Sequence, residues 1–401
     1  MKRMQTLAVT AIFFSALLSA CAALKSDPGP VRASAPQPSV NAATLEQPAG
    51  WQAKAVRNVI LMIGDGMGIN HIWLTRVVSA GTQGRLTMER MPFCGLITTS
   101  SASDLKTDSA AAATALATGR KTANGMIAEL PDGTRLKTLL EKAEERKLAT
   151  GLVVTKAVTD ATPAAFGAHS PSRSNQSDIA AQILDQGIDV VLGGGRVFWR
   201  PVLKGGTRTD GRDLISEAVN RGYRSVTCAR DLEQAEAPPL LGLLAENAMT
   251  GTGEEPSLAA MTAKAIALLS REPQGFFLMV EGSRIDSASH RHAADDVVRG
   301  VLGFDDAVKE ALDYAVHDGH TLVIVTADHE TGGLVVLGGT ERPGIRWAGF
   351  DHSSSPVALF AYGPGADDFT GMLDNTEVAL RIAALLGFEP FPQEFPSPSA
   401  P

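Results

Sequence analysis

Two kinds of residue pattern alternate along most of the chain. Short apolar runs rich in Val and Ile recur between segments whose apolar residues repeat with helical spacing. Such runs are typical of the strands of a parallel sheet, because helices cover both faces of the sheet and bury its side chains. The pattern therefore predicts an α/β fold in three layers, with a largely parallel central sheet and helices on both faces.

Acidic residues follow the four clearest of the predicted strands. Sites in open α/β sheets form beyond the carboxyl ends of strands, so these residues are expected to share one crevice. Any one of them could instead cap a helix or close a turn. Together they would concentrate negative charge in that crevice unless cations were bound. The strands and the residues after them are 59–63 with Asp65; 276–280 with Glu281 and Asp286; 322–325 with Asp328 and His329; and the run in TGLVVTKAVTDATP with Asp160 and Thr162.

Histidines near these acids extend the predicted set of metal ligands. On a helix that begins near Asp286, His290 lies four residues further on and shares its face, whereas His292 is rotated away. His352 precedes another apolar strand and can supply a ligand from a distant part of the chain. Carboxylate oxygens with a few imidazole nitrogens indicate zinc or a similar ion beside a harder ion such as magnesium.

An alanine-rich helix is predicted after Asp108, in the stretch LKTDSAAAATALATGRKTANG. One interpretation is a structural helix that Asp108 caps and that small side chains allow to pack tightly. The other is that Ser109, at the head of the helix, is a nucleophile whose backbone must approach a ligand closely. The stretch by itself leaves both interpretations open.

The two ends of the chain differ from its middle. Lys2 and Arg3 precede an apolar run at 7–18 that is too short for a convincing membrane span and leads into LLSAC. This arrangement predicts a lipoprotein signal peptide at 1–20 and lipidation of Cys21, hence a periplasmic protein anchored by lipid to the outer membrane. An ordinary secretory signal with a chance cysteine is the alternative, and it too predicts export.

Composition divides the rest of the chain and limits its partners. A tether rich in Pro, Ala and Ser is predicted at 21–53, one large domain at 54–390 and a Pro-rich tail at 391–401. The formal net charge of −8 argues against nucleic acid as a specific partner. Cys94 and Cys228 could pair in an oxidising compartment, but the sequence does not give their separation.

Six segments of the chain form a pattern that is specific when they are taken together. They are, in chain order, GDGMG, TDSAAAATALATGRKTANG, DATPAAFGAHSPSR, VEGSRID, TADHETGG and DHSSSPVALFAYGP. Each is weak alone, but all six in this order resemble the motifs of the bacterial alkaline phosphatase family, and the resemblance covers about residues 58–386. The resemblance implies the alkaline-phosphatase fold, with 54–390 as the catalytic domain, and the hydrolysis of phosphate monoesters at alkaline pH through a phosphoserine.

The resemblance also implies roles for individual residues. Ser109 would be the nucleophile and Arg173 would bind the phosphate. Two zinc ions and one magnesium ion are implied, and the family is commonly dimeric, so a homodimer is one expectation. The implied ligands are Asp286, His290 and His352 for the first zinc; Asp65, Asp328, His329 and the Ser109 oxygen for the second; and Asp65, Thr162 and Glu281 for magnesium, with Asp160 nearby or acting through water.

One position departs from the family pattern. Ser287 follows Asp286, where many relatives carry a Lys or His that neighbours the Asp160 position. The change removes a positive charge or a metal ligand beside the third site. The sequence still predicts magnesium there and leaves the occupancy of the site and the phosphate affinity open.

Two other functions compete with the phosphomonoesterase. A phosphodiesterase of the same superfamily would keep the metal ligands and change the residues that meet the phosphate oxygens. A lipid-tethered protein that binds phosphate or metal without catalysis would need the same acids and histidines. The presence of Ser109 and Arg173 favours the phosphomonoesterase, because a simple binder has no need of the nucleophile.

Overall fold

The computed structural model describes residues 43–47, 50–339 and 343–395. The predicted signal peptide, Cys21 and most of the predicted tether therefore lie outside the described residues. Among the residues that are described, no helix combines the length and the apolar character that a membrane crossing requires.

Ten strands of the described chain form one central sheet. Nine of them run in the same direction, and β13 alone among these ten runs antiparallel to its neighbours β2 and β8. The strands, in their order across the sheet, are β14 (Gly371–Asp374), β2 (Phe93–Thr98), β13 (Val357–Tyr362), β8 (Thr321–Thr326), β1 (Asn58–Ile63), β7 (Phe276–Glu281), β3 (Ala149–Ala157), β4 (Val190–Gly194), β6 (Leu240–Leu243) and β5 (Arg224–Val226).

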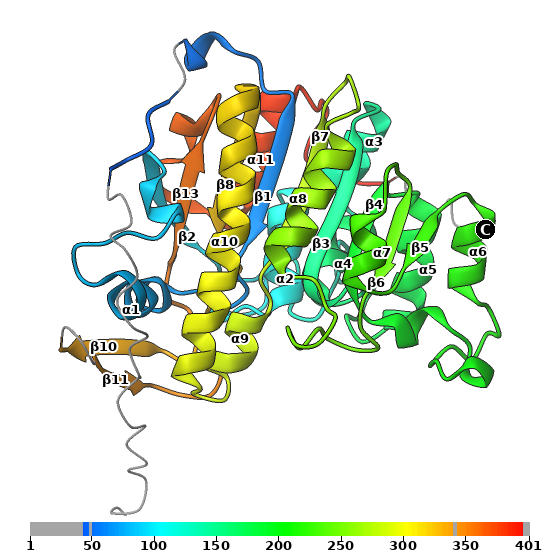
Figure 1. Cartoon of the computed structure of the whole chain (residues 1–401), viewed down its shortest axis with the longest axis horizontal. Helices are drawn as coiled ribbons and strands as arrows, with labels where there is room; N and C mark the ends of the chain where they lie inside the picture. Colours follow the sequence, from blue (N-terminus) through cyan, green and yellow to red (C-terminus); the bar gives the residue numbers. More distant parts are fainter. Residues whose placement is uncertain (1–42, 48–49, 340–342, 396–401) are drawn as a thin grey trace, which may run out of the picture.

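Helices cover both faces of this sheet (Figure 1). On one face α8 (Leu258–Leu269) packs along α10 (Ala294–Asp318), and on the other α2 (Ser109–Thr118) packs against α4 (Ala161–Gly167) and α11 (Asn375–Leu386). The predicted three-layer α/β fold is therefore confirmed. The other α-helices and strands of the described chain are α1 (Ile69–Ala80), α3 (Leu139–Glu145), α5 (Gln176–Gln186), α6 (Leu214–Asn220), α7 (Ala229–Glu233), α9 (Arg284–Ser289), β9 (Glu330–Thr331), β10 (Leu334–Gly338), β11 (Gly344–Trp347) and β12 (His352–Ser353).

The four strands that the sequence singled out are neighbours at the centre of the sheet. They stand in the order β8, β1, β7, β3, and every residue of β1, β7 and β8 is buried. In register, Ile63 at the end of β1 pairs with Glu281 on one side and with Thr326 on the other. The carboxyl ends of these strands therefore lie side by side, as the pattern of acids predicted.

The described parts of the tether and the tail lie against the body of the protein. Leu45 packs on the hydrophobic core, and its backbone N–H donates to the carbonyl of Arg90 at 2.8 Å. Near the other end, the backbone N–H of Lys137 donates to the carbonyl of Gln393 at 2.8 Å. The Phe395 ring meets the imidazole of His169 edge-on, with centroids 5.1 Å apart.

Cys94 and Cys228 are both free thiols in the described structure. Cys94 lies in β2, near one end of the sheet, and Cys228 follows β5, at the other end. The disulfide that the sequence left open therefore does not form.

Candidate active site

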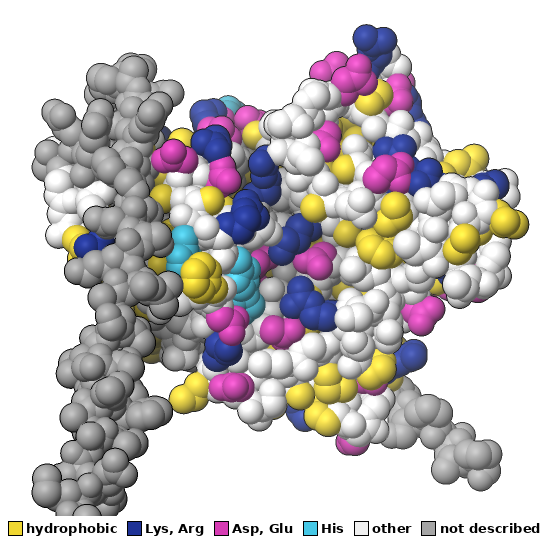
Figure 2. Space-filling model, turned by 90° about the horizontal axis from the view of Figure 1, so that it is seen from below, with side chains coloured by type: hydrophobic (Ala, Val, Ile, Leu, Met, Phe, Trp, Pro, Cys, Tyr) yellow, Lys and Arg dark blue, Asp and Glu magenta, His cyan; other side chains and the backbone are white. Residues whose placement is uncertain are grey.

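The predicted site residues gather at the carboxyl edge of the sheet. Figure 2, which views the molecule from this side, shows histidine, acidic and basic side chains close together on one face. The strands β1, β3, β7 and β8 supply the acids at their ends, and the start of α2 supplies Ser109. Segments far apart in the sequence thus meet in one place.

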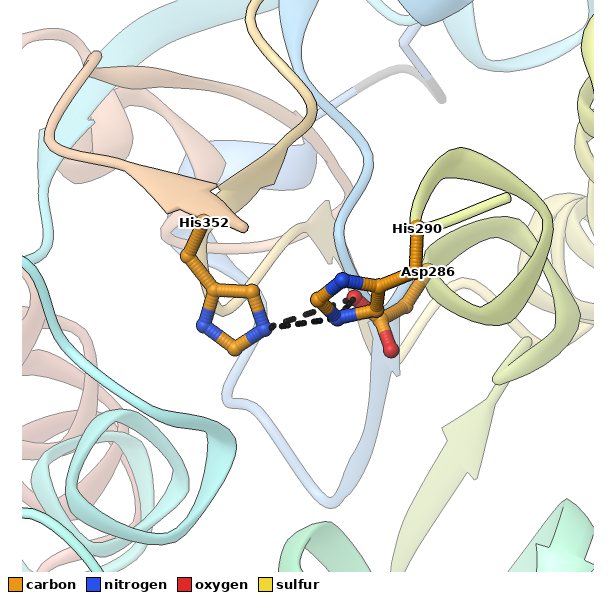
Figure 3. A group of neighbouring side chains, drawn as sticks. All are labelled: Asp286, His290 and His352. Carbon is orange, nitrogen blue, oxygen red and sulfur yellow. Dashed lines mark hydrogen bonds and ion pairs between the residues drawn. The ribbon is translucent and has the colours of Figure 1, made fainter. Parts of the chain in front are cut away.

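Asp286, His290 and His352 form the first group of candidate metal ligands (Figure 3). Nε2 of His290 lies 3.2 Å from Oδ1 of Asp286, and Nε2 of His352 lies 3.5 Å from the same oxygen. Asp286 is in α9 and His290 ends that helix, so the predicted four-residue spacing places both on one side. His352 comes from β12, which pairs with β9 after β8.

Hydrogen bonds at the Nδ1 atoms of His290 and His352 orient the two imidazole rings so that their Nε2 atoms face the site. Nδ1 of His290 donates to the carbonyl of Phe350 at 2.5 Å, and Nδ1 of His352 donates to the carbonyl of Thr107 at 3.0 Å. Because a carbonyl only accepts, each neutral ring carries its proton on Nδ1 and a lone pair on Nε2. The two Nε2 atoms nevertheless face each other at 3.2 Å, an arrangement that suits a bound cation. A proton on one Nε2 can take the place of the cation between the two rings. The hydrogen bond to Asp286 favours this protonation and raises the pKa of His290 to about 9.

Asp65, Asp328 and His329 form the second group, and all three are fully buried. Oδ1 of Asp328 accepts the backbone N–H groups of Gly66 at 3.0 Å and His329 at 2.9 Å. Within the described structure, Oδ2 of Asp328 and Oδ1 of Asp65 have no hydrogen-bond donor. Burial lowers the pKa of His329 to about 4 and raises that of Asp65 well above its usual value. Buried carboxylate oxygens beside a neutral imidazole are a donor set that fits zinc.

Ser109 lies at the start of α2, beside the second group. Its Oγ is 3.2 Å from Nε2 of His329, and the residue is 3% exposed. Asp108 caps the helix by accepting the backbone N–H of Ala111 at 3.0 Å. The N–H groups of the first turn therefore point toward the site, which favours an anion there.

Arg173 approaches the site from the loop after α4. Its NH1 donates to Oδ2 of Asp108 at 3.1 Å, and its NH2 lies 3.7 Å from Oδ1 of Asp160. Asp108 thus holds both the head of α2 and the guanidinium group.

The third predicted group consists of Asp160, Thr162 and Glu281 together with Asp65. In the part of the chain that the structure describes, Oδ2 of Asp160, the Thr162 hydroxyl and both Glu281 oxygens are buried without a hydrogen-bond partner. Asp160 stands at the N-cap of α4, yet its side chain makes no capping bond there. Burial raises the pKa of Glu281 to about 8. Buried oxygens without donors are costly unless a positive charge lies near them, so this group needs a cation beside it.

Lys156 supplies such a charge and was not predicted from the sequence. Its Nζ lies 2.9 Å from Oδ2 of Asp65, 3.6 Å from Oδ2 of Asp160 and 3.7 Å from Oδ2 of Asp286. Burial alone would lower the pKa of Lys156, but the nearby carboxylates outweigh it and raise that pKa. The signal in the sequence was a lysine inside an otherwise uncharged strand, four residues before Asp160.

Thr331 is a second residue that the sequence did not reveal. Its hydroxyl donates to Oδ1 of Asp286 at 2.7 Å and lies 3.3 Å from Nδ1 of His329. It therefore orients one ligand of each of the first two groups. The predicted rotation of His292 away from the ligands is correct, because its Nε2 donates to the carbonyl of Gly349 at 2.6 Å.

The fold and the site together define the class of a hydrolase with an α/β fold in which two groups of candidate metal ligands lie beside a serine at a helix start and an arginine. The Alkaline phosphatase family model matches residues 56–347. Alkaline phosphatase 4 of Bacillus subtilis is 33% identical over 86% of this chain and 92% of its own length. The chain belongs to the alkaline phosphatase family and is an enzyme that hydrolyses phosphate monoesters.

Solved structures agree with this assignment. The alkaline phosphatase from the Antarctic bacterium TAB5 is 34% identical, covers 84% of this chain and 100% of its own, and superposes with a TM-score of 0.78. A mutant of that enzyme with magnesium bound in its M3 site is also 34% identical, covers 83% and 99%, and superposes with a TM-score of 0.77. The family and the two ligand groups indicate that this chain uses metal cofactors.

Proposed function

We propose that this enzyme acts through Ser109 as nucleophile, forms a phosphoserine and holds two zinc ions. The observation that carries the proposal is the position of the Ser109 hydroxyl, 3.2 Å from His329 and at the head of a buried helix. A structural helix has no need of a serine directed at a metal-ligand group.

The first zinc would be held by Asp286, His290 and His352, and the second by Asp65, Asp328 and His329, with Ser109 beside it. Bound there, zinc would supply Lewis acidity that makes the serine hydroxyl ionise more easily and neutralises charge on phosphate oxygens. Magnesium was predicted for the third group. Two carboxylates of that group, those of Asp65 and Asp160, already have the ammonium of Lys156 beside them.

The protein's own groups position the phosphate. The N–H groups at the start of α2 and the guanidinium of Arg173 would hold nonbridging oxygens, and the planar fork of arginine suits two of them at once. Attack by Oγ of Ser109 forms the new P–O bond as the ester oxygen leaves. Water then hydrolyses the phosphoserine and restores the hydroxyl.

Hydrolysis of p-nitrophenyl phosphate at alkaline pH, measured beside the bis-ester, tests the proposal. The monoester should be preferred, and a chelator should abolish its turnover. Ser109→Ala should lower kcat by roughly a thousandfold or more. Ser257→Ala, which changes the N-cap residue of α8, is the matched control and should keep its activity.

The alternatives give different results in the same assay. Preference for the bis-ester would make the enzyme a phosphodiesterase. Zinc binding without turnover of either ester would leave a metal-binding protein. Full activity in the Ser109→Ala variant would overturn the role of the serine.

Export and lipid anchoring through Cys21 form a second part of the proposal, supported by the signal-like first 20 residues. Expression in a Gram-negative host with a lipoprotein pathway should place the full chain in the outer-membrane fraction. Cys21→Ser should move phosphatase activity to the soluble fraction. If the parent protein and the Cys21→Ser variant appeared in the same fraction, lipid anchoring through Cys21 would be wrong.

A homodimer is the remaining expectation from the family. Light scattering on the soluble body, residues 43–401, would give its mass directly. A mass of one chain across micromolar concentrations would rule the dimer out.

A further inference from the structure

Lys156 stands where the acids of the third group converge. Its side chain leaves β3 between Asp65, at the end of β1, and Asp160, at the start of α4. The side chain is 19% exposed, and Nζ contacts three carboxylates within 3.7 Å. A lysine so enclosed by acids takes the role of a counter-ion rather than of a solvated surface charge.

The balance of charge in the site points the same way. Five carboxylates meet in the three groups, and two divalent ions with one ammonium carry an equal positive charge. Arg173 is not needed for this balance, because it pairs with Asp108 and would bind the phosphate. A third divalent ion would leave the site strongly positive and would stand close to the ammonium. The five carboxylates are those of Asp65, Asp160, Glu281, Asp286 and Asp328.

The neighbouring position offers no other cation. Ser287, directly after Asp286, is neutral, and the lysine reaches Asp286 from β3 instead. In the described part of the chain, Lys156 and Arg173 are the lysine and arginine side chains that form ion pairs with Asp65, Asp160 or Asp286. They occupy different sides of Asp160, since Arg173 lies near Oδ1 and Lys156 near Oδ2.

We propose that the Lys156 ammonium takes the place of the third cation, so that this enzyme binds two zinc ions and needs no magnesium. The inference rests on the proposed two-zinc site. Lys156 would neutralise Asp65 and Asp160 through their Oδ2 atoms and hold these carboxylates in position. It is a positioning residue, because it acts through these carboxylates.

The metal content of the purified enzyme tests this directly. The protein is stripped with a chelator, refilled with zinc and magnesium together, desalted and analysed by plasma emission spectrometry. The expected content is about two zinc ions per chain and almost no magnesium. One magnesium ion per chain in the native enzyme would overturn the inference.

Lys156→Met keeps the unbranched shape and most of the length of the side chain and removes its charge. With the acids freed, this variant should gain about one magnesium ion per chain, and its activity should become dependent on added magnesium. Failure to gain magnesium in a folded variant would also count against the inference. If the variant does not fold, the metal content of the native enzyme still decides.

Lys142→Met is the matched control. Lys142 is also a buried lysine with an acidic partner, because its Nζ lies 3.0 Å from Glu145, but that acid is outside the site. Its loss should leave both the metal content and the magnesium dependence unchanged. A gain of magnesium in this control would make the effect nonspecific and overturn the assignment to Lys156.

The same samples separate this inference from the proposed function. Absence of both bound zinc and phosphatase activity would be a failure of the proposed function. An active enzyme with two zinc ions and one magnesium ion would leave that function intact and defeat only the role of Lys156.

Discussion

Asp108 connects the start of a helix to the residue that would hold the phosphate. One of its oxygens accepts the backbone N–H groups of Ala111 and Gly125, each at 3.0 Å, and the other accepts from Arg173 at 3.1 Å. A single carboxylate therefore fixes the helix end, the loop after it and the guanidinium. Its loss should be felt in both stability and substrate binding.

Asp108→Ala should lower the free energy of unfolding by about 1 kcal/mol, because the helix loses its cap. It should also raise KM for a phosphate monoester about tenfold, since Arg173 loses its charge-assisted hydrogen bond. Urea unfolding and steady-state kinetics measure the two effects. Ser257→Ala removes another cap, in which Oγ accepts from Ala260 at 3.1 Å, and should lower stability without changing KM. An unchanged KM in Asp108→Ala would contradict the orienting role.

The buried imidazole of His71 should make the stability of the protein depend on pH. It is fully buried with Nε2 3.0 Å from the Ser289 hydroxyl, and burial lowers its pKa from 6.5 to about 4. Between these values the unfolded chain binds a proton that the folded chain does not. The stabilisation is therefore complete above pH 6.5 and is lost as the pH falls toward 4, by about 2 kcal/mol at pH 5.

Urea unfolding at pH 7 and at pH 5 checks this expectation. His71→Gln should show a smaller difference in unfolding free energy between the two pH values than the parent protein. The exposed His317 gives the control, because His317→Gln should leave the difference unchanged. An equal difference in all three proteins would assign the acid sensitivity to other groups.

Helix α2 has almost no exposed surface. Its ten residues are all buried, and it packs against α4 on one side and α11 on the other. The alanines allow this close approach because they add little beyond the helix backbone. The interpretation of the alanine-rich stretch as a capped, tightly packed helix is therefore confirmed, and the same packing places Ser109 beside the second group, where the proposed nucleophile would stand.

Ala113→Leu should destabilise the protein by about 1–3 kcal/mol, because the added atoms have no space between the packed helices. Activity should fall as well if the helix shifts and carries Ser109 with it. Guanidinium unfolding and a monoester assay measure both. Ala260→Leu, at an exposed position of α8, should change stability by less than about 0.5 kcal/mol.

The strand ends were predictable and the lysine between them was not. Asp65, Glu281 and Asp328 follow apolar runs, and a parallel sheet must bring such positions to one edge. The sequence alone does not say that β7 stands between β1 and β3. Without the order of the strands in the sheet, the approach of Lys156 to Asp65 and Asp286 cannot be predicted. Likewise, the carbonyls that turn His290 and His352 inward belong to loops whose paths only the fold determines.

In the molecule as a whole, the buried acids predict that the stability of the fold depends on bound metal. Without ions the central strands converge on several carboxylates whose oxygens lack partners within the described structure. Ions that bind only the folded state stabilise it in proportion to the logarithm of their concentration over Kd. The enzyme should therefore lose stability as well as activity when it is stripped.

Removal of metal at pH 8 should lower Tm by about 10 °C or more, and zinc should restore it. Magnesium alone should not restore Tm, because both ligand groups contain imidazole nitrogen. Calorimetry with and without chelator gives the values, and a chelator saturated with zinc is the control. An unchanged Tm after verified metal loss would show that the folded state tolerates its unpaired acids.

Trp347, at the end of β11, lies beside this site. Its indole stacks on the His292 imidazole with centroids 4.9 Å apart and an interplanar angle of 4°, and it meets His71 edge-on at 6.0 Å. His292 is two residues from His290, a ligand of the first group. The ultraviolet emission of this indole will therefore respond to ligation nearby, so the filling of the site can be followed optically in real time, without dye, label or substrate.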